Sequence, residues 1–233
     1  MNKIYNYQQK CYKFNMITIP EAVEQLILHE PFLEEALARG LLNLSELARQ
    51  IRPGLQLELK KKIETGAVVM ALKRLKDRIE PLHHARTRFI RDLGDITVRS
   101  HLMEFSFQTS GSLLEKQQQL LVEIRKRRNS FVTMTQGVTE LTMIFSAGLE
   151  KTVDRLFAGE RVISRLPNLS AVTIRLPGKS VTTSGVFYTL LKQLAWQDIN
   201  VVEVVSTLTE LTLIVERQHV DQAFSALKSF LWK

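Results

Sequence analysis

The sequence has 233 residues, of which 45% are hydrophobic and 24% are charged, and its formal net charge is +8. This composition is typical of a globular chain with one large domain or two to three small ones. Every apolar run is far shorter than the roughly 20 residues of a transmembrane helix, which excludes a membrane protein, and the single cysteine, Cys11, excludes an intrachain disulfide. Because the first residues also lack the apolar core of a signal peptide, we expect a cytoplasmic protein.

The N-terminal part of the chain is predicted to be helical. Residues 1–17 show no regular pattern and are expected to form a flexible tail. From residue 18 to residue 91, apolar side chains recur with the helical period, which predicts an all-helical domain. Thr18 and Glu21 have the spacing of a capping box at the start of its first helix.

One part of this helical domain is similar to a DNA-binding motif. The segment Leu44–Ile51 (LSELARQI) is similar to the first helix of a helix-turn-helix, and Thr65–Arg78 would be its recognition helix. Because proline interrupts helices, Pro53-Gly54 is expected to end the first of these helices and Pro81 the second. The basic side chains available for phosphate groups are Lys73, Arg74, Lys76 and Arg78.

The positive charge of the chain is concentrated in the same region. Between Arg49 and Arg91, twelve residues are Lys or Arg and four are Asp or Glu. A basic stripe is the electrostatic signature of nucleic-acid binding, although a solvated helix face has the same pattern. The connecting segment Gln56–Glu64 is longer than the tight turn of the motif. A helical dimerisation or linker domain is therefore the alternative interpretation.

Beyond the helical domain the apolar period changes from near 3.6 residues to near 2, which indicates strands. Residues 95–166 and residues 170–233 each follow the order strand, helix, strand, strand, helix, which is the ferredoxin-like order. The predicted fold class is therefore α+β, with an N-terminal all-helical domain followed by two ferredoxin-like units with antiparallel sheets. Pro167-Asn168 is expected to separate the last strand of the first unit from the first strand of the second.

An internal repeat of about 70 residues supports this division into two units. When the stretch from Phe131 to Phe145 is aligned with the stretch from Val201 to Val215, six of the fifteen positions are identical. The identities include the run Thr139–Thr142, which matches Thr209–Thr212. One supersecondary unit is thus made twice, and function should lie in what the pair does together.

The sequence carries no recognisable catalytic or metal-binding motif. Gly178-Lys179-Ser180 ends like a P-loop, but the position of the first P-loop glycine is occupied by Thr173, within a predicted strand. The five histidines have no metal-ligand spacing with carboxylates or thiols, and no nucleophile elbow is present. We therefore expect neither an enzyme nor a cofactor or metal site.

The loop from Pro177 to Gly185 is the best candidate for a binding site. It follows a predicted strand, contains small and hydroxyl residues, and leads into a helix. The free N–H groups at a helix N-terminus favour a carboxylate or phosphate. In the alternative interpretation, Thr183 or Ser184 simply caps the helix.

The second unit resembles an ACT domain of the kind found at the C-terminus of aspartate kinases. The resembling features are the loop LPGKSVTTSG, the helix that ends at Asp198-Ile199-Asn200, the hairpin from Ser206 to Glu210, and the strand that leads to Val220-Asp221-Gln222-Ala223. Through the internal repeat, the resemblance extends more weakly to residues 96–166. It implies two ACT units (βαββα[β]) that bind an amino acid at a dimeric or pseudo-dimeric interface. No kinase segment precedes the units, so kinase activity is not expected.

The resemblance also implies a set of ligand-binding residues in the second unit. They are Gly178, Lys179, Ser180, Thr182, Thr183 and Ser184 in the loop, and Asn200, Val201 and Val202 at the start of the second strand. The chain departs from the ACT pattern at Lys233, which follows the last helix without a fourth strand. Either the second sheet is short, or a strand such as Ile96–Arg99 completes it.

Two functions are consistent with these patterns. In the first, the protein is a ligand-sensing regulator whose tandem ACT units bind an amino acid and change how the helical domain acts on DNA or a protein. In the second, it is a noncatalytic interaction subunit with a vestigial ligand site. In both, we expect a homodimer formed through the ACT sheets. The exposed edges of ferredoxin-like sheets require a cover, and the strand with Val201-Val202 and Val204-Val205 is apolar on both faces, which predicts burial on each side.

Overall fold

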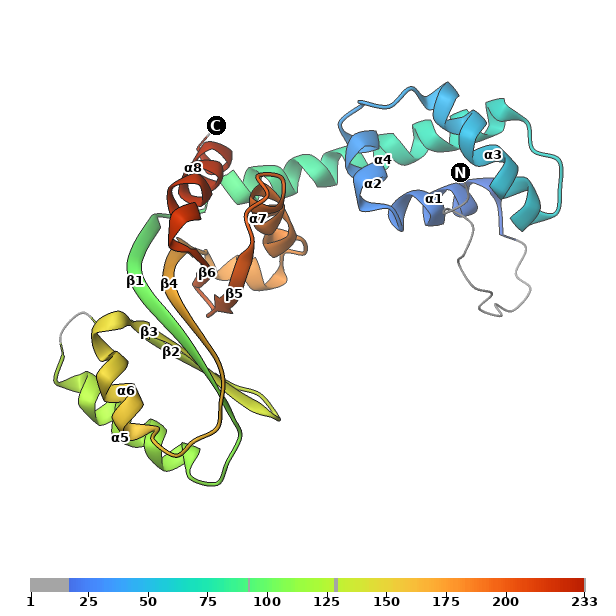
Figure 1. Ribbon diagram of the computed structural model, residues 1–233. Coiled ribbons are helices and arrows are strands. Elements are labelled where there is room, and N and C mark those ends of the chain that lie inside the picture. Colours follow the sequence, from blue (N-terminus) through green and yellow to red (C-terminus); the bar gives the residue numbers. More distant parts are fainter. Residues whose placement is uncertain (1–16, 92, 128–129, 233) are drawn as a thin grey trace. The chain divides into compact units, whose positions relative to one another are not determined.

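The computed structural model describes residues 17–91, 93–127 and 130–232. The chain divides into two compact units, Met1–Thr87 and Arg88–Lys233, which we call the helical unit and the sheet unit (Figure 1). Cys11 and nearly all of the predicted tail lie outside the described residues. Among the helices that are described, none has the length and apolar character needed to cross a membrane.

Four helices form the described part of the helical unit, as the apolar periodicity predicts. They are α1 (Ile19–Leu28), α2 (Pro31–Ala38), α3 (Leu44–Leu59) and α4 (Thr65–Arg91), the last of which ends in the sheet unit. The capping box of α1 is confirmed, because the backbone N–H of Thr18 donates to Glu21 Oε2 at 2.7 Å. The core residues with no more than 1% exposure are Val23, Ile27, Leu37, Ala48, Leu55, Ile63, Val68 and Leu72.

The two predicted helix breaks at proline are wrong. Helix α3 continues through Pro53 to Leu59, and α4 continues through Pro81. An interior proline costs a helix about 3 kcal/mol, but burial of a leucine contributes about 1.5–3 kcal/mol. Leu55, just beyond Pro53, is fully buried and helps hold the last turn of α3 against the core. The actual break follows at Lys60, whose φ of 50° is left-handed.

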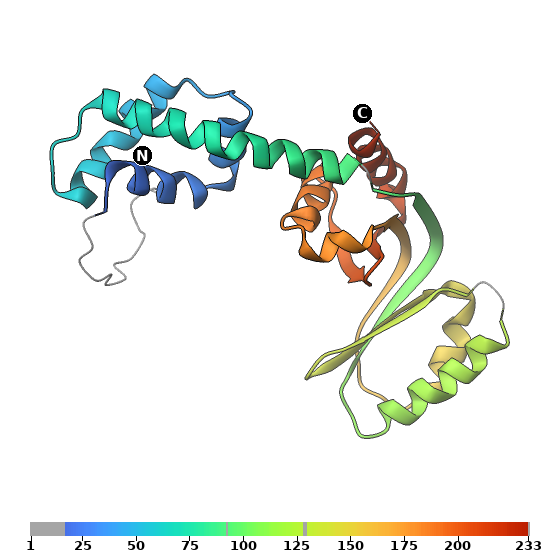
Figure 2. The same cartoon turned by 180° about the vertical axis from the view of Figure 1, so that it is seen from behind.

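The sheet unit contains one antiparallel sheet of six strands in the order β2-β3-β1-β4-β6-β5. The strands are β1 (Ile96–Gln108), β2 (Val132–Gln136), β3 (Glu140–Ser146), β4 (Val162–Arg175), β5 (Val201–Ser206) and β6 (Glu210–Glu216). Figures 1 and 2 both show β1 and β4 as two long strands that run side by side. Each is about twice as long as a typical strand.

The two long strands are shared by both ferredoxin-like units. The C-terminal half of β1 pairs with β3, and the C-terminal half of β4 pairs with β6. The N-terminal half of β1 pairs with the C-terminal half of β4, from Ile96 opposite Ile174 to Arg99 opposite Ala171. Ile96–Arg99 therefore supplies the fourth strand of the second unit, the second of the two alternatives that the sequence left open.

Pro167-Asn168 does not separate two strands, as the sequence predicted, but lies inside β4. The β1–β4 register shifts there, from Leu102 opposite Leu169 to Glu104 opposite Leu166. Asn168 has a left-handed φ of 59°. A bulge at this point accommodates a proline, which has no N–H to donate to the neighbouring strand.

Helices cover one face of the sheet in two separate layers. The first layer is α5 (Leu113–Arg125) with α6 (Glu150–Leu156), and the second is α7 (Val186–Ala195) with α8 (Val220–Leu231). Under the first layer, Phe105 and Phe145 meet edge to face with ring centroids 5.1 Å apart. Under the second layer lie the buried residues Val172, Ile174, Leu190, Leu194, Leu211, Leu213 and Leu227.

The face of the sheet opposite the helices is also closed. The residues that alternate with the helix-facing ones form a third buried cluster, whose members are Leu102, Ile144, Leu169, Ala171 and Ile214. These residues come from both ferredoxin-like units, and none is more than 2% exposed. Because no helix layer covers them, the sheet must curl so that strands of the two units pack against each other across this cluster.

Candidate ligand-binding loops

The predicted ligand loop of the second unit connects β4 to α7. It contains a 3₁₀ turn, Gly178–Thr182, and ends at Gly185, whose φ of 80° favours a residue without a Cβ. The hydroxyls of Thr182 and Thr183 both donate to the carbonyl oxygen of Lys179, at 3.1 and 2.9 Å. The hydroxyl groups of the loop thus hold its own backbone in shape.

The alternative interpretation, in which Thr183 or Ser184 caps α7, is wrong. The N-cap position is Gly185, which has no side chain to accept a hydrogen bond. No side-chain cap therefore satisfies the first N–H groups of α7, which leaves them available to another acceptor.

Ser180 is the residue of this loop that stands out chemically. It is 8% exposed, and its Oγ atom is buried with no hydrogen-bond partner among the described residues. A buried hydroxyl without a partner costs about 1–3 kcal/mol. Such groups are rare in folded proteins and are commonly satisfied by a ligand or an ordered water.

The two parts of the predicted ligand site lie at opposite ends of the second unit. The loop follows Arg175, and the N–H of Leu176 donates to the carbonyl of Thr209 at the β5–β6 hairpin. Asn200 precedes β5, whose first residue Val201 pairs with Val215 at the other end of β6. Seven residues of β4 separate these ends, from Leu169 to Arg175, which is roughly 20 Å of strand. Within one unit, the structure does not bring Asn200, Val201 and Val202 to the loop.

The corresponding loop of the first unit holds a carboxylate from its own chain. Ser110 Oγ and Ser112 Oγ donate to the two oxygens of Glu160, at 2.7 and 2.5 Å, and Lys116 Nζ lies 2.8 Å from Oε1. The side chain of Glu160 is only 5% exposed. The hydrogen bonds from Lys116, Ser112 and Ser110, in that order, lower the pKa of Glu160 to about 2.

The four predicted phosphate-binding residues of α4 have different environments. Lys73 and Arg74 are exposed. Arg78 forms an ion pair with Glu24 of α1, which raises the pKa of Arg78. The Nζ atom of Lys76 lies 4.0 Å from Oε2 of Glu80 and packs beside Gly40, which follows α2. Helix α4 begins at Thr65, as predicted, but a five-residue connection from Lys60 to Glu64 precedes it.

Glu104 is a buried acid that the sequence did not reveal. It is 5% exposed on the face of β1 opposite the helices, and its Oε2 atom has no hydrogen-bond partner among the described residues. Burial, followed by the charges of Glu203 and Glu140, raises its pKa to about 7. Its alternation with Met103 and Phe105 predicts a solvent-facing side chain, and only the curl of the sheet buries it. No group of three His, Cys, Asp or Glu residues in the described chain is arranged to hold a metal ion.

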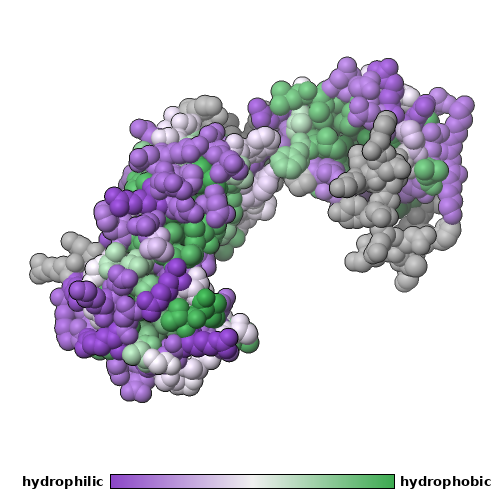
Figure 3. Space-filling view, viewed as in Figure 1, coloured by the Kyte–Doolittle hydropathy of each residue, from purple (hydrophilic) through white to green (hydrophobic). Residues whose placement is uncertain are grey.

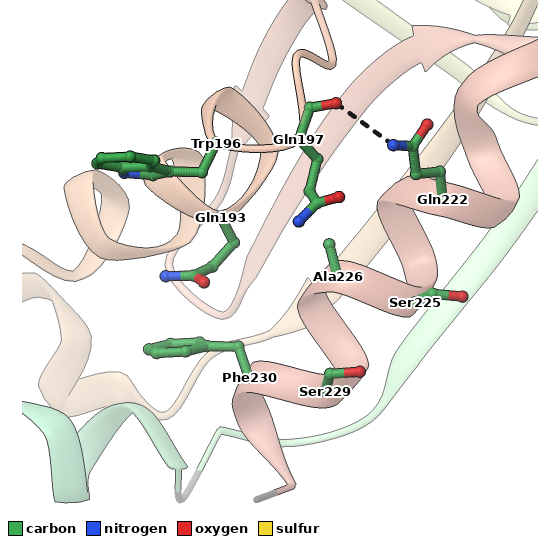
Figure 4. A pocket seen from close by; sticks show the side chains of 8 residues that line it. All are labelled: Gln193, Trp196, Gln197, Gln222, Ser225, Ala226, Ser229 and Phe230. Carbon is green, nitrogen blue, oxygen red and sulfur yellow. Dashed lines mark hydrogen bonds between the residues drawn. The ribbon is translucent and has the colours of Figure 1, made fainter.

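A groove lies between α7 and α8 on the outer side of the second helix layer. Its volume is about 370 Å³. Figure 4 shows Trp196 and Phe230 on one side of it, and Gln222 of α8 donating to the carbonyl of Gln197 at 3.3 Å. Trp196 is 68% exposed. On the face drawn in Figure 3, hydrophobic residues of the sheet unit show as separate patches within a mainly hydrophilic surface.

Solved structures are similar to this chain, whereas no family model and no curated protein matches its sequence. The aspartate kinase of Clostridium acetobutylicum, an allosteric enzyme, is 14% identical over 60% of this chain and 34% of its own, with a TM-score of 0.50. The regulatory subunit of aspartate kinase from Thermus thermophilus is 15% identical over 59% of this chain and 98% of its own, with a TM-score of 0.49. Aspartokinase III of E. coli, in complex with aspartate and ADP, is 15% identical over 60% of this chain and 34% of its own, with a TM-score of 0.49.

These comparisons concern the fold alone. At 14% identity, the Clostridium match supports an ACT-like α+β fold with an antiparallel sheet, in agreement with the strand order of the sheet unit. The predicted class of the sheet unit is therefore confirmed at the level of its fold.

Proposed function

We propose that the protein is a ligand-sensing regulatory protein that binds an amino acid through its tandem ACT-like units. The observation that carries the proposal is the loop before α7. It combines a helix N-terminus that has no side-chain cap with a buried hydroxyl at Ser180, which has no hydrogen-bond partner in the described part of the chain. The free N–H groups of α7 suit a carboxylate. Lys179, which is exposed in the same turn, supplies a positive charge beside them.

In this proposal, two copies of the chain complete one site. Strand β5 lies at the edge of the sheet, so its outer hydrogen-bonding groups can pair with a second copy. If two β5 strands pair antiparallel, Val201 of one copy lies beside Ser206 of the other. Asn200, Val201 and Val202 of one chain then approach the Gly178–Ser184 loop of the other, and their backbone groups and amide can bind the ammonium group of the amino acid.

The direct test is a thermal-shift screen of the twenty amino acids against the whole protein. A ligand at a hundred times its Kd stabilises a folded protein by about 2.7 kcal/mol. The Ser180→Ala and Asn200→Ala variants should each weaken the effect of the active amino acid. Gln218→Ala, which removes an exposed amide outside the site, should not. If none of the twenty amino acids changes the unfolding midpoint, the proposal is wrong.

In this proposal, the helical unit binds DNA, and the amino acid regulates that binding. Lys73 and Arg74 are the exposed members of the predicted phosphate-binding set, and the surrounding segment is strongly basic. Binding to duplex DNA should weaken steeply as salt rises, because each phosphate contact releases counterions. The Lys73→Gln/Arg74→Gln variant should bind more weakly and with a shallower salt dependence. The control Lys151→Gln/Arg217→Gln, which removes two exposed charges from the sheet unit, should bind like the unaltered protein.

The second candidate function is a noncatalytic protein-interaction subunit. The groove between α7 and α8 favours it, because exposed aromatic residues such as Trp196 are enriched in protein interfaces. In this case no amino acid stabilises the protein, and duplex DNA binds weakly with little dependence on salt. Retention of amino-acid binding in the Trp196→Ala variant would separate the groove from the ligand site.

A further inference from the structure

The carboxylate of Glu160 lies where the loop of the first unit meets its helix. Glu160 belongs to the turn between α6 and β4, whereas Ser110, Ser112 and Lys116 belong to the loop after β1 and the first turn of α5. The three donors reach both carboxylate oxygens at 2.5–2.8 Å. A lysine in the first turn of a helix opposes the helix dipole, and here the carboxylate beside it compensates.

The position equivalent to Glu160 in the second unit carries no carboxylate. The N–H of Gln108 donates to the carbonyl of Arg161 at 2.9 Å, and in the second unit the N–H of Arg175 donates to the carbonyl of Asp95 at 3.0 Å. This matched pairing places Gly94 at the position that Glu160 has in the first unit. Gly94 has no side chain, and a Cβ there would lie 3.1 Å from Cβ of Arg175.

We propose that Glu160 is a tethered ligand of the first unit: its carboxylate occupies a carboxylate-binding site formed by Ser110, Ser112 and Lys116. The first unit is then permanently occupied, and the second unit alone is open to a free carboxylate. One consequence, a stoichiometry of one amino acid per chain, rests on the proposed amino-acid binding. The site itself is independent of that function and can be tested without it.

The test is rescue of the Glu160→Ala variant by acetate. Unfolding midpoints are measured in sodium acetate and in sodium chloride at equal pH and ionic strength. We expect Glu160→Ala to lower the midpoint by roughly 3 to 8 °C in chloride, since three charge-assisted hydrogen bonds are lost. Acetate should recover part of this loss in Glu160→Ala but should leave the unaltered protein unchanged. The double variant Glu160→Ala/Lys116→Met, which lacks the cation of the site, should show no recovery.

Two results would overturn the inference: a midpoint of Glu160→Ala equal to that of the unaltered protein, or an equal response to acetate in all three proteins. If Glu160→Ala does not fold, Glu160→Ser replaces it, because the serine side chain is polar and short enough to leave room for acetate. A negative amino-acid screen together with acetate rescue would reject the proposed function and keep the tethered carboxylate. Calorimetry with an amino acid identified in the screen should give one site per chain, and two in Glu160→Ala.

Discussion

His101 of β1 and Asn168 of β4 adopt the same left-handed backbone conformation, with φ of 60° and 59°. They occupy equivalent positions in the two long strands, since each immediately precedes a leucine of the pair Leu102–Leu169. Two hydrogen-bonded hydroxyl pairs also occupy equivalent positions in the two units. Ser106 lies 3.0 Å from Thr142 in the first unit, and Thr173 lies 2.9 Å from Thr212 in the second. The two ferredoxin-like units are therefore related by an approximate two-fold axis that passes between His101 and Asn168.

Glycine at these two positions should stabilise the sheet unit. A residue with a Cβ in the left-handed region is strained by about 1 kcal/mol, but asparagine tolerates the region better than most residues. We expect His101→Gly to raise the free energy of unfolding by up to about 1 kcal/mol and Asn168→Gly to raise it less. Urea denaturation measures both. A large loss of stability in either variant would mean that the side chain, and not the backbone conformation, is important there.

The burial of Glu104 should make the protein less stable as pH rises from about 4.5 to about 7. In that interval the folded protein keeps the proton, because the pKa of Glu104 is raised to about 7, while the unfolded chain with its ordinary pKa of 4.5 loses it. The folded state thus binds more protons, and the stability lost across the interval is about 3 kcal/mol.

The Glu104→Gln variant should remove this pH dependence. The difference in unfolding free energy between the variant and the unaltered protein should therefore grow through the interval and stay constant above it. Chemical denaturation at a series of pH values measures this difference. Glu203→Gln, which removes one of the two neighbouring charges, should shift the pH interval of this stability change only slightly. A constant difference between the proteins at all pH values would show that Glu104 ionises normally.

A cavity in the first ferredoxin-like unit should weaken the second. Phe145 is fully buried against Phe105, so Phe145→Ala should cost about 3–5 kcal/mol. Because β1 and β4 belong to both units, hydrogen exchange should become faster at the β6 amides, such as that of Leu213, as well as at the β3 amides. The free energy of opening calculated from exchange should fall by the same amount in both strands. Leu114→Ala, at a position that is 64% exposed, should change neither. Exchange in β6 that is unaffected by Phe145→Ala would show that the two units unfold separately.

Replacement of Pro53 by alanine should stabilise α3. An interior proline is about 3 kcal/mol less favourable than alanine in a helix, and the loss of rigidity in the unfolded chain offsets up to about 1 kcal/mol of the gain. We expect a net increase of about 2–3 kcal/mol in the free energy of unfolding, measured by exchange of the α3 amides. Pro20→Ala is the matched control, since Pro20 lies in the first turn of α1, where proline is well tolerated.

The periodicity of apolar residues predicted most of the elements, because helix and strand burial follow the local pattern directly. Three features depended on contacts distant in sequence and could not be predicted in this way. Leu55 helps keep α3 helical beyond Pro53, the pairing with β1 keeps β4 continuous through Pro167, and the curl of the sheet buries Glu104. In each case, packing that is invisible to the local pattern overrides it.

The candidate site was predicted less completely than the fold. The loop before α7 was found from its hydroxyl residues and its place before a helix, both of which are local. The distance between this loop and Asn200 follows from the strand register, which a single sequence does not specify. The contact between Ser110 and Glu160 spans fifty residues, and nothing in either segment indicates the other.

The exchange of strands between the repeats means that neither repeat is a separable module. A fragment that begins at residue 170 would lack Ile96–Arg99 and would expose the edge of β4 that this segment covers. A fragment that ends at residue 166 would expose the N-terminal half of β1 in turn. Truncation, domain transplantation or fusion between the repeats should therefore yield aggregation-prone pieces, and recombinant work on the sheet unit must keep residues 96–231 together.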